Sequence, residues 1–323
     1  MAITPDQVAW FSETFGNVVH NVERVIIGKT EAIRLAVTCM IAEGHLLLED
    51  YPGTGKTTLA RALAQSVEGT SSRIQFTPDL LPSDVTGVTI YDQKSGEFEF
   101  HQGPIFASVV LADEINRASP KTQSALLEVM EESRVTVDGK TYSAGSPFMV
   151  IATQNPIEQA GTYRLPEAQL DRFLMKTTLG YPDREGTLRI LAQGGTRPRS
   201  AALSAVITSQ AVAELSQLAA AVHIEPSVLD YIARLVEETR HTADVRLGVS
   251  IRGALALVRT SRVWAASQGR HFVVPDDVKM LAVPCLSHRI ILDPESEFNG
   301  VTAADVMARV IGTVQPPTER ASA

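Results

Sequence analysis

Asp50-Tyr-Pro-Gly-Thr-Gly-Lys-Thr57 is the stretch of sequence that decides the fold. The apolar run Leu46–Leu48 before it is typical of a buried strand in a parallel sheet. The residues after it place Leu59, Leu63 and Val67 on one stripe of a helix. A glycine-rich loop that ends in Lys-Thr between a strand and a helix is typical of a phosphate-binding loop, because its backbone N–H groups and the helix dipole favour an anion. The sequence therefore predicts a phosphate site between these two elements.

Residues of this loop have distinct expected roles. Gly53 and Gly55 allow the backbone to bend. The ammonium group of Lys56 is expected to reach the β- and γ-phosphates, and the hydroxyl of Thr57 is expected to hold Mg²⁺. The generic pattern begins with glycine, whereas this loop begins with Asp50. Aspartate tolerates a left-handed backbone, so the loop can close, but the sequence gives no reason for a carboxylate beside a triphosphate.

Composition indicates a globular protein of one large domain or two modest ones. The chain has 323 residues, of which 44% are hydrophobic and 20% charged. Its net charge of −8 provides no overall positive field for nucleic-acid phosphates. With only Cys39 and Cys285, a disulfide framework is not expected and a reducing compartment is the default. The sequence has no signal-peptide pattern and no apolar run of bilayer length, so we expect a cytoplasmic protein without a membrane span.

The stretch Ser108–Glu114 is an apolar run that ends in a pair of acids. Open α/β sheets bind ligands at the carboxyl ends of their parallel strands, so both acids are expected at the site. Asp113 would hold Mg²⁺, directly or through water, and Glu114 would orient and deprotonate the attacking water. Apolar strands followed by acids are common, and the assignment gains its weight from the phosphate-binding loop upstream.

Two hairpins and a polar strand end are predicted next. Alternating residues predict hairpins over Val88–Phe100 and Arg134–Tyr142, the second turning at Asp138-Gly139. Such hairpins are insertions on an α/β frame and are available for contacts. The strand Phe148–Thr153 ends just before Asn155, whose amide can hydrogen-bond the attacking water or the γ-phosphate. An asparagine before proline is, however, more often a turn residue.

Helical periodicity dominates after about Tyr181, where the strand-like runs stop. The sequence thus indicates an α/β domain followed by a helical domain. The expected parts are an α/β nucleotide-binding core over residues 1–185, a helical lid over residues 186–315 and a polar tail over residues 316–323.

The motifs together resemble those of the MoxR family of AAA+ ATPases. The resemblance covers nearly the whole chain from about Val25, and it rests on the following segments: Tyr51–Thr57, Phe76–Asp84, Ala112–Ala118, Lys121–Glu128, Ala152–Pro156 and Leu165–Phe173. It implies an α/β P-loop core, with a parallel sheet between helices and two β-hairpin insertions, followed by a small all-α lid. It also implies hexameric rings that bind ATP and Mg²⁺ and remodel client protein complexes like a chaperone, often with a von Willebrand A-domain partner.

The resemblance also implies roles for single residues. Glu114 corresponds to the catalytic base, Asn155 to sensor 1, and Arg172 to an arginine finger that reaches the γ-phosphate of a neighbouring subunit. Arg252, in Ser250-Ile-Arg252, corresponds to the arginine of sensor 2, and Arg117 is the rival candidate for the finger. The metal residues would be Thr57 and Asp113. The nucleotide would be bound by Ile27, Gly28, Pro52, Gly53, Thr54, Gly55, Lys56, Thr57 and Thr58.

Three alternatives remain open at this level. The phosphate-binding pattern could occur by chance in a solvent-exposed loop, but the other residues predicted for the same site disfavour this alternative. A nucleic-acid motor of a related AAA+ branch would share the hairpins, but the net charge and the absence of Lys/Arg clusters in either hairpin argue against it. A nucleotide-gated scaffold without useful turnover would have no need for Glu114, Asn155, Arg172 and Arg252 together.

Overall fold

The computed structural model describes residues 3–51, 53–155, 163, 165–192 and 203–317. The chain divides into two compact units. The α/β unit comprises Asn17–Arg172 and Thr177–Ala213, and the helical unit comprises residues 1–16, 173–176 and 214–323. The predicted boundary after residue 185 stays a prediction.

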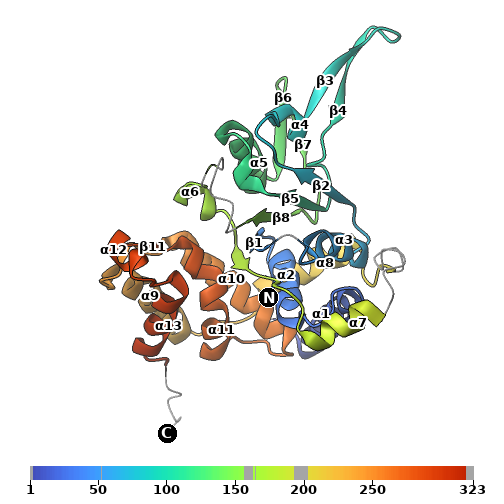
Figure 1. The fold of residues 1–323 in the computed structure, drawn as a ribbon. Coiled ribbons are helices and arrows are strands. Elements are labelled where there is room, and N and C mark those ends of the chain that lie inside the picture. Colours follow the sequence, from blue (N-terminus) through green and yellow to red (C-terminus); the bar gives the residue numbers. More distant parts are fainter. Residues whose placement is uncertain (1–2, 52, 156–162, 164, 193–202, 318–323) are drawn as a thin grey trace. The chain divides into compact units, whose positions relative to one another are not determined.

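A parallel sheet forms the centre of the α/β unit (Figure 1). Its central strands are buried on both faces because their residues are almost all apolar, as expected of a parallel sheet covered by helices. The strand order is β2-β5-β8-β1-β9, with bounds Ser71–Gln75, Val109–Asp113, Met149–Gln154, Leu46–Glu49 and Met175–Thr177; Met175 and Lys176 of β9 are grouped with the helical unit. The pairs β2–β5, β5–β8 and β8–β1 are all parallel.

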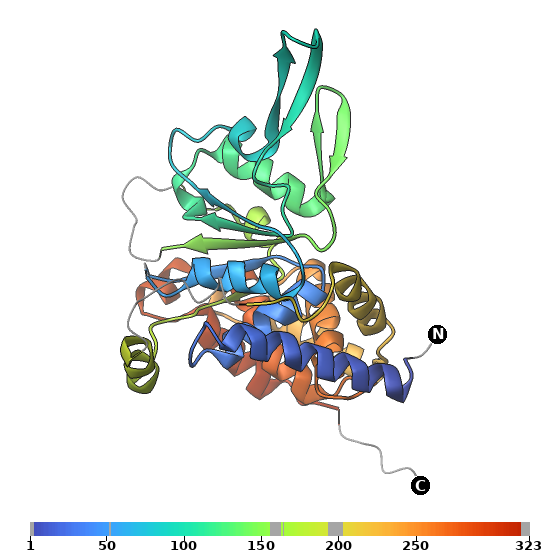
Figure 2. The same cartoon turned by 90° about the vertical axis from the view of Figure 1, so that its right-hand side faces the viewer.

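Helices cover both faces of this sheet (Figures 1 and 2). Helices α4 and α5 lie on one side, and α2 and α3 lie on the other. The helices of this unit are α2 (Thr30–Ile41), α3 (Lys56–Ser66), α4 (Pro82–Thr86), α5 (Pro120–Glu132), α6 (Glu167–Leu170) and α7 (Arg184–Ala192), with a 3₁₀ turn, η1, at Ile115–Arg117. The last part of α1 (Pro5–Glu23), from Asn17 onward, also belongs here.

Two antiparallel hairpins project from the α5 side of the sheet (Figure 1). The first consists of β3 (Gly87–Asp92) and β4 (Glu97–Gln102), and the second of β6 (Arg134–Val137) and β7 (Lys140–Ser143). The ring of Phe100 stacks on that of Tyr142 with centroids 4.2 Å apart, which joins the two hairpins. The parallel sheet with two hairpin insertions confirms the predicted class of the core.

The helical unit has the predicted succession of helices and one feature that helical periodicity did not predict. That feature is a two-stranded antiparallel sheet of β10 (Val245–Leu247) and β11 (Ile291–Leu292). The helices are α8 (Ser209–Ala220, partly in the α/β unit), α9 (Pro226–His241), α10 (Ile251–Ser267), α11 (Pro275–Leu286), α12 (Pro294–Phe298) and α13 (Ala303–Thr313), with a 3₁₀ turn, η3, at Ser287–Arg289. Among the described helices, none is both long enough and apolar enough to cross a bilayer.

The start of α11 is fixed by a buried carboxylate. Asp277 receives two hydrogen bonds from the guanidinium group of Arg270, at 2.7 and 2.5 Å, and a third from the backbone N–H of Val274 at 2.9 Å. Its side chain is only 4% exposed. Three charge-assisted bonds compensate for removing this carboxylate from water.

We expect Asp277→Ala to lower the free energy of unfolding of the helical unit by about 2–3 kcal/mol, because Arg270 loses its partner and Val274 its cap. Both tryptophans, Trp10 and Trp264, belong to this unit, so urea unfolding followed by tryptophan fluorescence measures the effect.

The neighbouring residue provides a matched control. Asp276 is exposed and pairs with Lys279 at 3.0 Å, so Asp276→Ala should cost less than about 1 kcal/mol. Equal losses for the two variants would contradict the assignment of the buried contact as the stabilising one.

Candidate functional site

The predicted phosphate-binding loop lies between β1 and the N-terminus of α3. Gly53 has φ +83° and Gly55, the N-cap of α3, has φ +98°, a backbone region in which other residues are strained. A Cβ at Gly53 would touch nothing within 4 Å, so this glycine is required by backbone conformation and not by packing. The first turn of α3 carries no acidic residue that would oppose an anion. The loop therefore has the backbone conformation expected of a phosphate-binding loop; Pro52 lies outside the described residues.

Lys56 joins this loop to the second predicted stretch. Its ammonium nitrogen lies 3.8 Å from a carboxylate oxygen of Asp113 and 3.5 Å from the carbonyl oxygen of Asp50. Its side chain is only 10% exposed, and so is that of Asp113. The structure thus brings the loop and the acid pair together at one edge of the sheet.

Asp113 is held by two hydrogen-bond donors on neighbouring strands. The hydroxyl of Thr153 in β8 and the guanidinium group of Arg73 in β2 each donate to it at 2.6 Å. Burial acts to raise the pKa of Asp113, but these hydrogen bonds and the positive charges of Lys56 and Arg73 outweigh burial and hold the pKa below its ordinary value. Asp113 is therefore ionised at neutral pH, as a metal ligand must be.

Glu114 adopts a left-handed backbone conformation, with φ +57°, directly after β5. Its backbone N–H donates to the hydroxyl oxygen of Thr153 at 2.9 Å. Its Oε2 accepts hydrogen bonds from Gln75 at 3.0 Å and from Arg117 at 2.9 Å. Both side-chain bonds fall on one oxygen, so Oε1 is the atom that could receive a proton from water.

Sequence reasoning missed the residues that position the two acids. Thr153 bonds to both Asp113 and Glu114, and it sits at the end of an apolar run that gives no sign of a special role. A signal exists in the strand register, since Ala112 pairs with Ala152 and Gln75 with Asp113. Polar residues at the ends of paired strands lie side by side, which only the strand order reveals.

Other predicted nucleotide residues lie around the same loop. Ile27 and Gly28 lie between α1 and α2, and Gly28 has φ +71°. Thr57 and Thr58 are half-buried in the first turn of α3, and Asn155 follows β8 directly at the carboxyl edge of the sheet. Thr54 donates a hydrogen bond from its hydroxyl to the carbonyl of Tyr51 at 3.3 Å, which helps to close the loop.

The donor set suits Mg²⁺. The candidates, the hydroxyl of Thr57 and the ionised carboxylate of Asp113, are hard oxygen ligands of the kind that Mg²⁺ takes together with substrate phosphates. Within the described part of the chain no cluster of three or more His, Cys, Asp or Glu side chains forms an all-protein metal site. The residues therefore fit a metal bound jointly with a nucleotide.

Known proteins with the same architecture identify the family. Residues 45–175 match the ATPase family associated with various cellular activities (AAA), and residues 237–310 match the AAA lid domain. A crystal structure of a protein from Cytophaga hutchinsonii superposes with a TM-score of 0.89 at 36% identity, covering 97% of this chain and 98% of that one. The uncharacterized protein YeaC of Bacillus subtilis is 47% identical over 95% of this chain and 96% of its own length. Chaperone MoxR1 of Mycobacterium tuberculosis is 39% identical over 94% of this chain and 82% of its own length. This chain belongs to the MoxR family of AAA ATPases.

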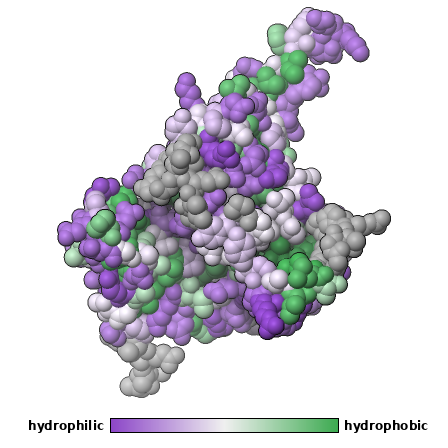
Figure 3. Space-filling view, in the orientation of Figure 1, coloured by the Kyte–Doolittle hydropathy of each residue, from purple (hydrophilic) through white to green (hydrophobic). Residues whose placement is uncertain are grey.

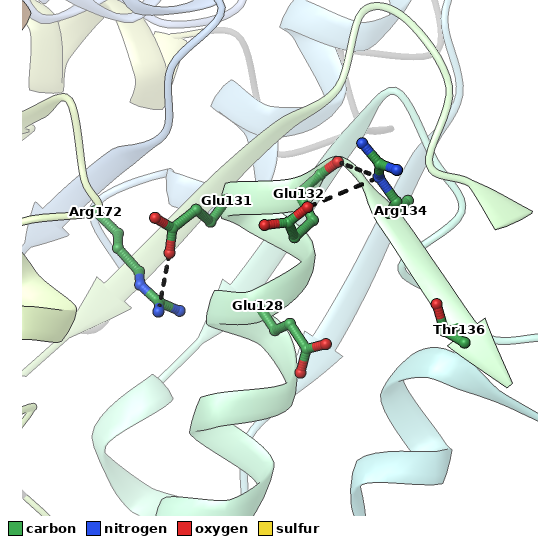
Figure 4. Close-up of a pocket in the computed structure, with 6 residues that line it drawn as sticks. All are labelled: Glu128, Glu131, Glu132, Arg134, Thr136 and Arg172. Atoms are coloured by element: carbon green, nitrogen blue, oxygen red, sulfur yellow. Dashed lines mark hydrogen bonds and ion pairs between the residues drawn. The ribbon is translucent and has the colours of Figure 1, made fainter. Parts of the chain in front are cut away.

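The arginine that the MoxR resemblance assigns to a neighbouring subunit's site is held by a glutamate. Arg172 forms a 2.9 Å ion pair with Glu131 of α5 at an open pocket of about 330 Å³ (Figure 4). Glu128 and Glu132 also line this pocket, together with Arg134 and Thr136 of β6. The side chain of Arg172 is 29% exposed, while its Nε atom is buried without a hydrogen-bond partner. Its rival Arg117 is instead bonded to Glu114 of the same chain.

The predicted sensor 2 residue belongs to the other unit. Arg252 lies in the first turn of α10 and is exposed, and its backbone N–H donates to the side chain of Ser250, the N-cap, at 3.2 Å. Since the phosphate loop belongs to the α/β unit, neither unit alone brings Arg252 and the loop together. The role of Arg252 in a MoxR-type site stays a prediction.

We expect Thr153→Val to lower ATP turnover by about 10–100-fold while changing ATP affinity little, because the buried hydroxyl positions both acids without being expected to contact the nucleotide. Thr153→Ser retains the hydroxyl and should keep most of the activity. Steady-state ATPase assays and nucleotide titrations of both variants measure the effect. A fully active Thr153→Val variant would show that Asp113 and Glu114 are positioned without this hydroxyl.

Proposed function

We propose that this chain hydrolyses ATP with Mg²⁺ and uses the energy to remodel or mature client protein complexes, in the manner of a chaperone. The observation that carries the proposal is the convergence of Lys56, Asp113 and Glu114 at the carboxyl edge of the sheet. ATP hydrolysis is what the AAA family implies, and one relative, 39% identical, is named a chaperone. We further infer a hexameric ring in the cytoplasm and a von Willebrand A-domain partner, as the family resemblance implies.

Each residue of the site has its own role in the proposed ATP hydrolysis. Backbone N–H groups of the loop and Lys56 would bind the phosphates and offset their negative charge. Thr57 and Asp113 would hold Mg²⁺, which would supply positive charge at the phosphates. Oε1 of Glu114 would orient a water and take its proton, while Gln75 and Arg117 keep the carboxylate in place through Oε2.

A site of this kind lacks positive charge on the outer side of the γ-phosphate unless another group supplies it. We assign that group to Arg172 of a neighbouring subunit, because its side chain is 29% exposed and lines an open pocket, where it pairs with Glu131. Hydrolysis would then depend on assembly. Arg117 is less suited, since its bond to Glu114 serves the site of its own chain.

The exposed side chains of the β3–β4 hairpin favour a protein as the client. Tyr91 and Phe98 face each other across its strands, with ring centroids 5.2 Å apart, and their side chains are 52% and 74% exposed. Figure 3 shows hydrophobic surface along this projecting hairpin behind a hydrophilic tip. Exposed aromatic side chains on a projecting element mark protein contact sites. The hairpin's Asp92, Glu97 and Glu99 disfavour nucleic acid as its partner.

We expect Glu114→Gln to keep ATP affinity but to lower turnover by about 10²–10⁴-fold, which is the usual contribution of a positioned general base. Lys56→Ala should instead abolish ATP binding with the fold intact. Calorimetric titration with MgATP, together with phosphate-release assays, separates the two effects. Wild-type turnover in Glu114→Gln would mean that another group activates the water, and unchanged affinity in Lys56→Ala would contradict the phosphate-loop assignment.

For Arg172, we expect Arg172→Ala to lower turnover by about 10³-fold, and we expect mixing to restore part of it. An inactive Glu114→Gln subunit offers an intact Arg172, and an inactive Arg172→Ala subunit offers an intact Glu114. At some interfaces of a mixed ring both groups meet at one nucleotide. The ATPase rate of mixtures, measured where light scattering demonstrates mixed oligomers, decides the matter. Absence of recovery there would show that Arg172 does not act across the interface.

A further inference from the structure

The carboxylate at the start of the phosphate loop has a defined structural partner. Asp50, which directly follows β1, is 2% exposed. Its carboxylate accepts hydrogen bonds from the backbone N–H groups of Leu179 and of Gly180, the latter at 2.9 Å. Its own backbone N–H donates to the carbonyl of Gln154 at the end of β8. Asp50 therefore links the loop both to the sheet and to residues 179–181, about 130 residues further along the chain. We call this segment the turn, because Gly180 has a left-handed φ of +61°.

This turn is held by further contacts from the same region. The ring of Tyr51 stacks on that of Tyr181, with centroids 5.9 Å apart and planes 3° from parallel. The ammonium group of Lys29 donates to the carbonyl of Tyr181 at 2.6 Å. The turn is thus attached on one side to the phosphate loop and on the other to the segment that contains Ile27 and Gly28.

The residues after the turn adjoin the proposed base-binding segment. A Cβ at Gly28 would lie 3.9 Å from a carboxylate oxygen of Asp183, and a Cβ at Gly186 would lie 3.7 Å from the Ile27 side chain. Asp183 also accepts a hydrogen bond from the backbone N–H of Gly186 at 2.7 Å, which fixes the start of α7. Residues 27–29 and residues 181–186 thus adjoin one another, and we call them together the base-side wall.

We propose that Asp50 is a positioning residue that sets the base-side wall, residues 27–29 and 181–186, at a fixed distance from the phosphate loop. The inference rests on the proposed function, since it assumes that adenine lies against this wall. A buried carboxylate with two backbone N–H donors is a short, charge-assisted connection that neither glycine nor a neutral side chain provides. Glycine at this place, as in the generic loop, would leave both N–H groups of the turn without their acceptor.

Loss of the Asp50 carboxylate should weaken binding of the adenine base and leave binding of the phosphates intact. Replacing Asp50 by asparagine keeps the shape but removes the charge and turns one acceptor into an N–H₂ donor that faces a backbone N–H. The turn should then loosen and the base-side wall with it. The N–H groups of the loop and Lys56 do not involve the carboxylate, so phosphate binding should persist.

The test compares ligands that contain the adenine base with one that lacks it. MgATP, MgADP and inorganic tripolyphosphate with Mg²⁺ are titrated calorimetrically into the full-length chain and into Asp50→Asn. We expect the dissociation constants of ATP and ADP to rise about tenfold or more, and that of tripolyphosphate to change less than about twofold. In turnover assays the KM for ATP should rise by a larger factor than kcat falls.

Two further variants keep the result interpretable. Lys29→Met removes a second polar anchor of the turn without touching Asp50, and it should reproduce the loss that is selective for adenine nucleotides even if Asp50→Asn folds poorly. Asp84→Asn is the matched control, because Asp84 also accepts a backbone N–H bond, from Leu81 at 2.8 Å, but at the start of α4. It should leave all three dissociation constants unchanged.

The outcomes separate this inference from the proposed function. Wild-type protein that binds none of the three ligands would contradict the ATPase proposal itself. Wild-type binding with equal weakening of ATP and tripolyphosphate in Asp50→Asn would overturn the positioning role and assign Asp50 to the phosphate loop alone. Unchanged ATP affinity in Asp50→Asn or in Lys29→Met would overturn the wall as a base-binding element.

Discussion

The parallel pairing of β1, β8 and β5 is the constraint on which the site depends. These strands are buried on both faces, so their interior positions accept only apolar residues, and polar side chains can follow only where each strand ends. The register aligns those ends, since Glu49 pairs with Gln154 and Ala112 with Ala152. The strand ends therefore meet at one edge of the sheet, and the residues that follow them lie there: the phosphate loop, the acid pair and Asn155.

Charge compensation at this edge follows from the same geometry. Asp113 is nearly buried, and a lone carboxylate there would be costly to ionise. Lys56 and Arg73, together with the Thr153 hydroxyl, reverse that cost and hold the pKa of Asp113 below its ordinary value of 3.8. A carboxyl whose pKa is lower in the folded state stabilises the fold above its unfolded pKa, and this stabilisation is lost as the pH falls through the lower folded-state value. Asp113 is thus ionised at neutral pH.

The elements of the core could be predicted from the sequence because each carries a local signal. The apolar run before Asp113, the glycines of the phosphate loop and the Asp138-Gly139 turn each specify a backbone conformation within a few residues. The partners of these elements carry no such signal. Thr153 ends an apolar strand, and Asp50 replaces a glycine for a reason that lies at Leu179 and Gly180, far along the chain. Long-range contacts depend on strand order, and a single sequence does not encode that order in any local pattern.

The position of Arg172 follows from how the chain passes between the two units. Arg172 ends a segment of the α/β unit, and the next residue, Phe173, groups with the helical unit. Within that unit, the guanidinium group of Arg289 donates to the carbonyl of Phe173 at 2.8 Å, and Nε2 of His288 lies 3.0 Å from the same carbonyl oxygen. Burial first, and then the charge of Arg289, lowers the pKa of His288 well below its ordinary value, so the ring is neutral at neutral pH.

The consequence is mechanical. One peptide bond fixes the Cα atoms of Arg172 and Phe173 about 3.8 Å apart. Any displacement of the Phe173 segment with the helical unit must therefore move the backbone of Arg172 as well. The helical unit also carries Arg252. Arg172, which the MoxR resemblance assigns to the γ-phosphate of a neighbouring subunit, is thus joined directly to a segment of the unit that carries Arg252, the predicted sensor 2 residue.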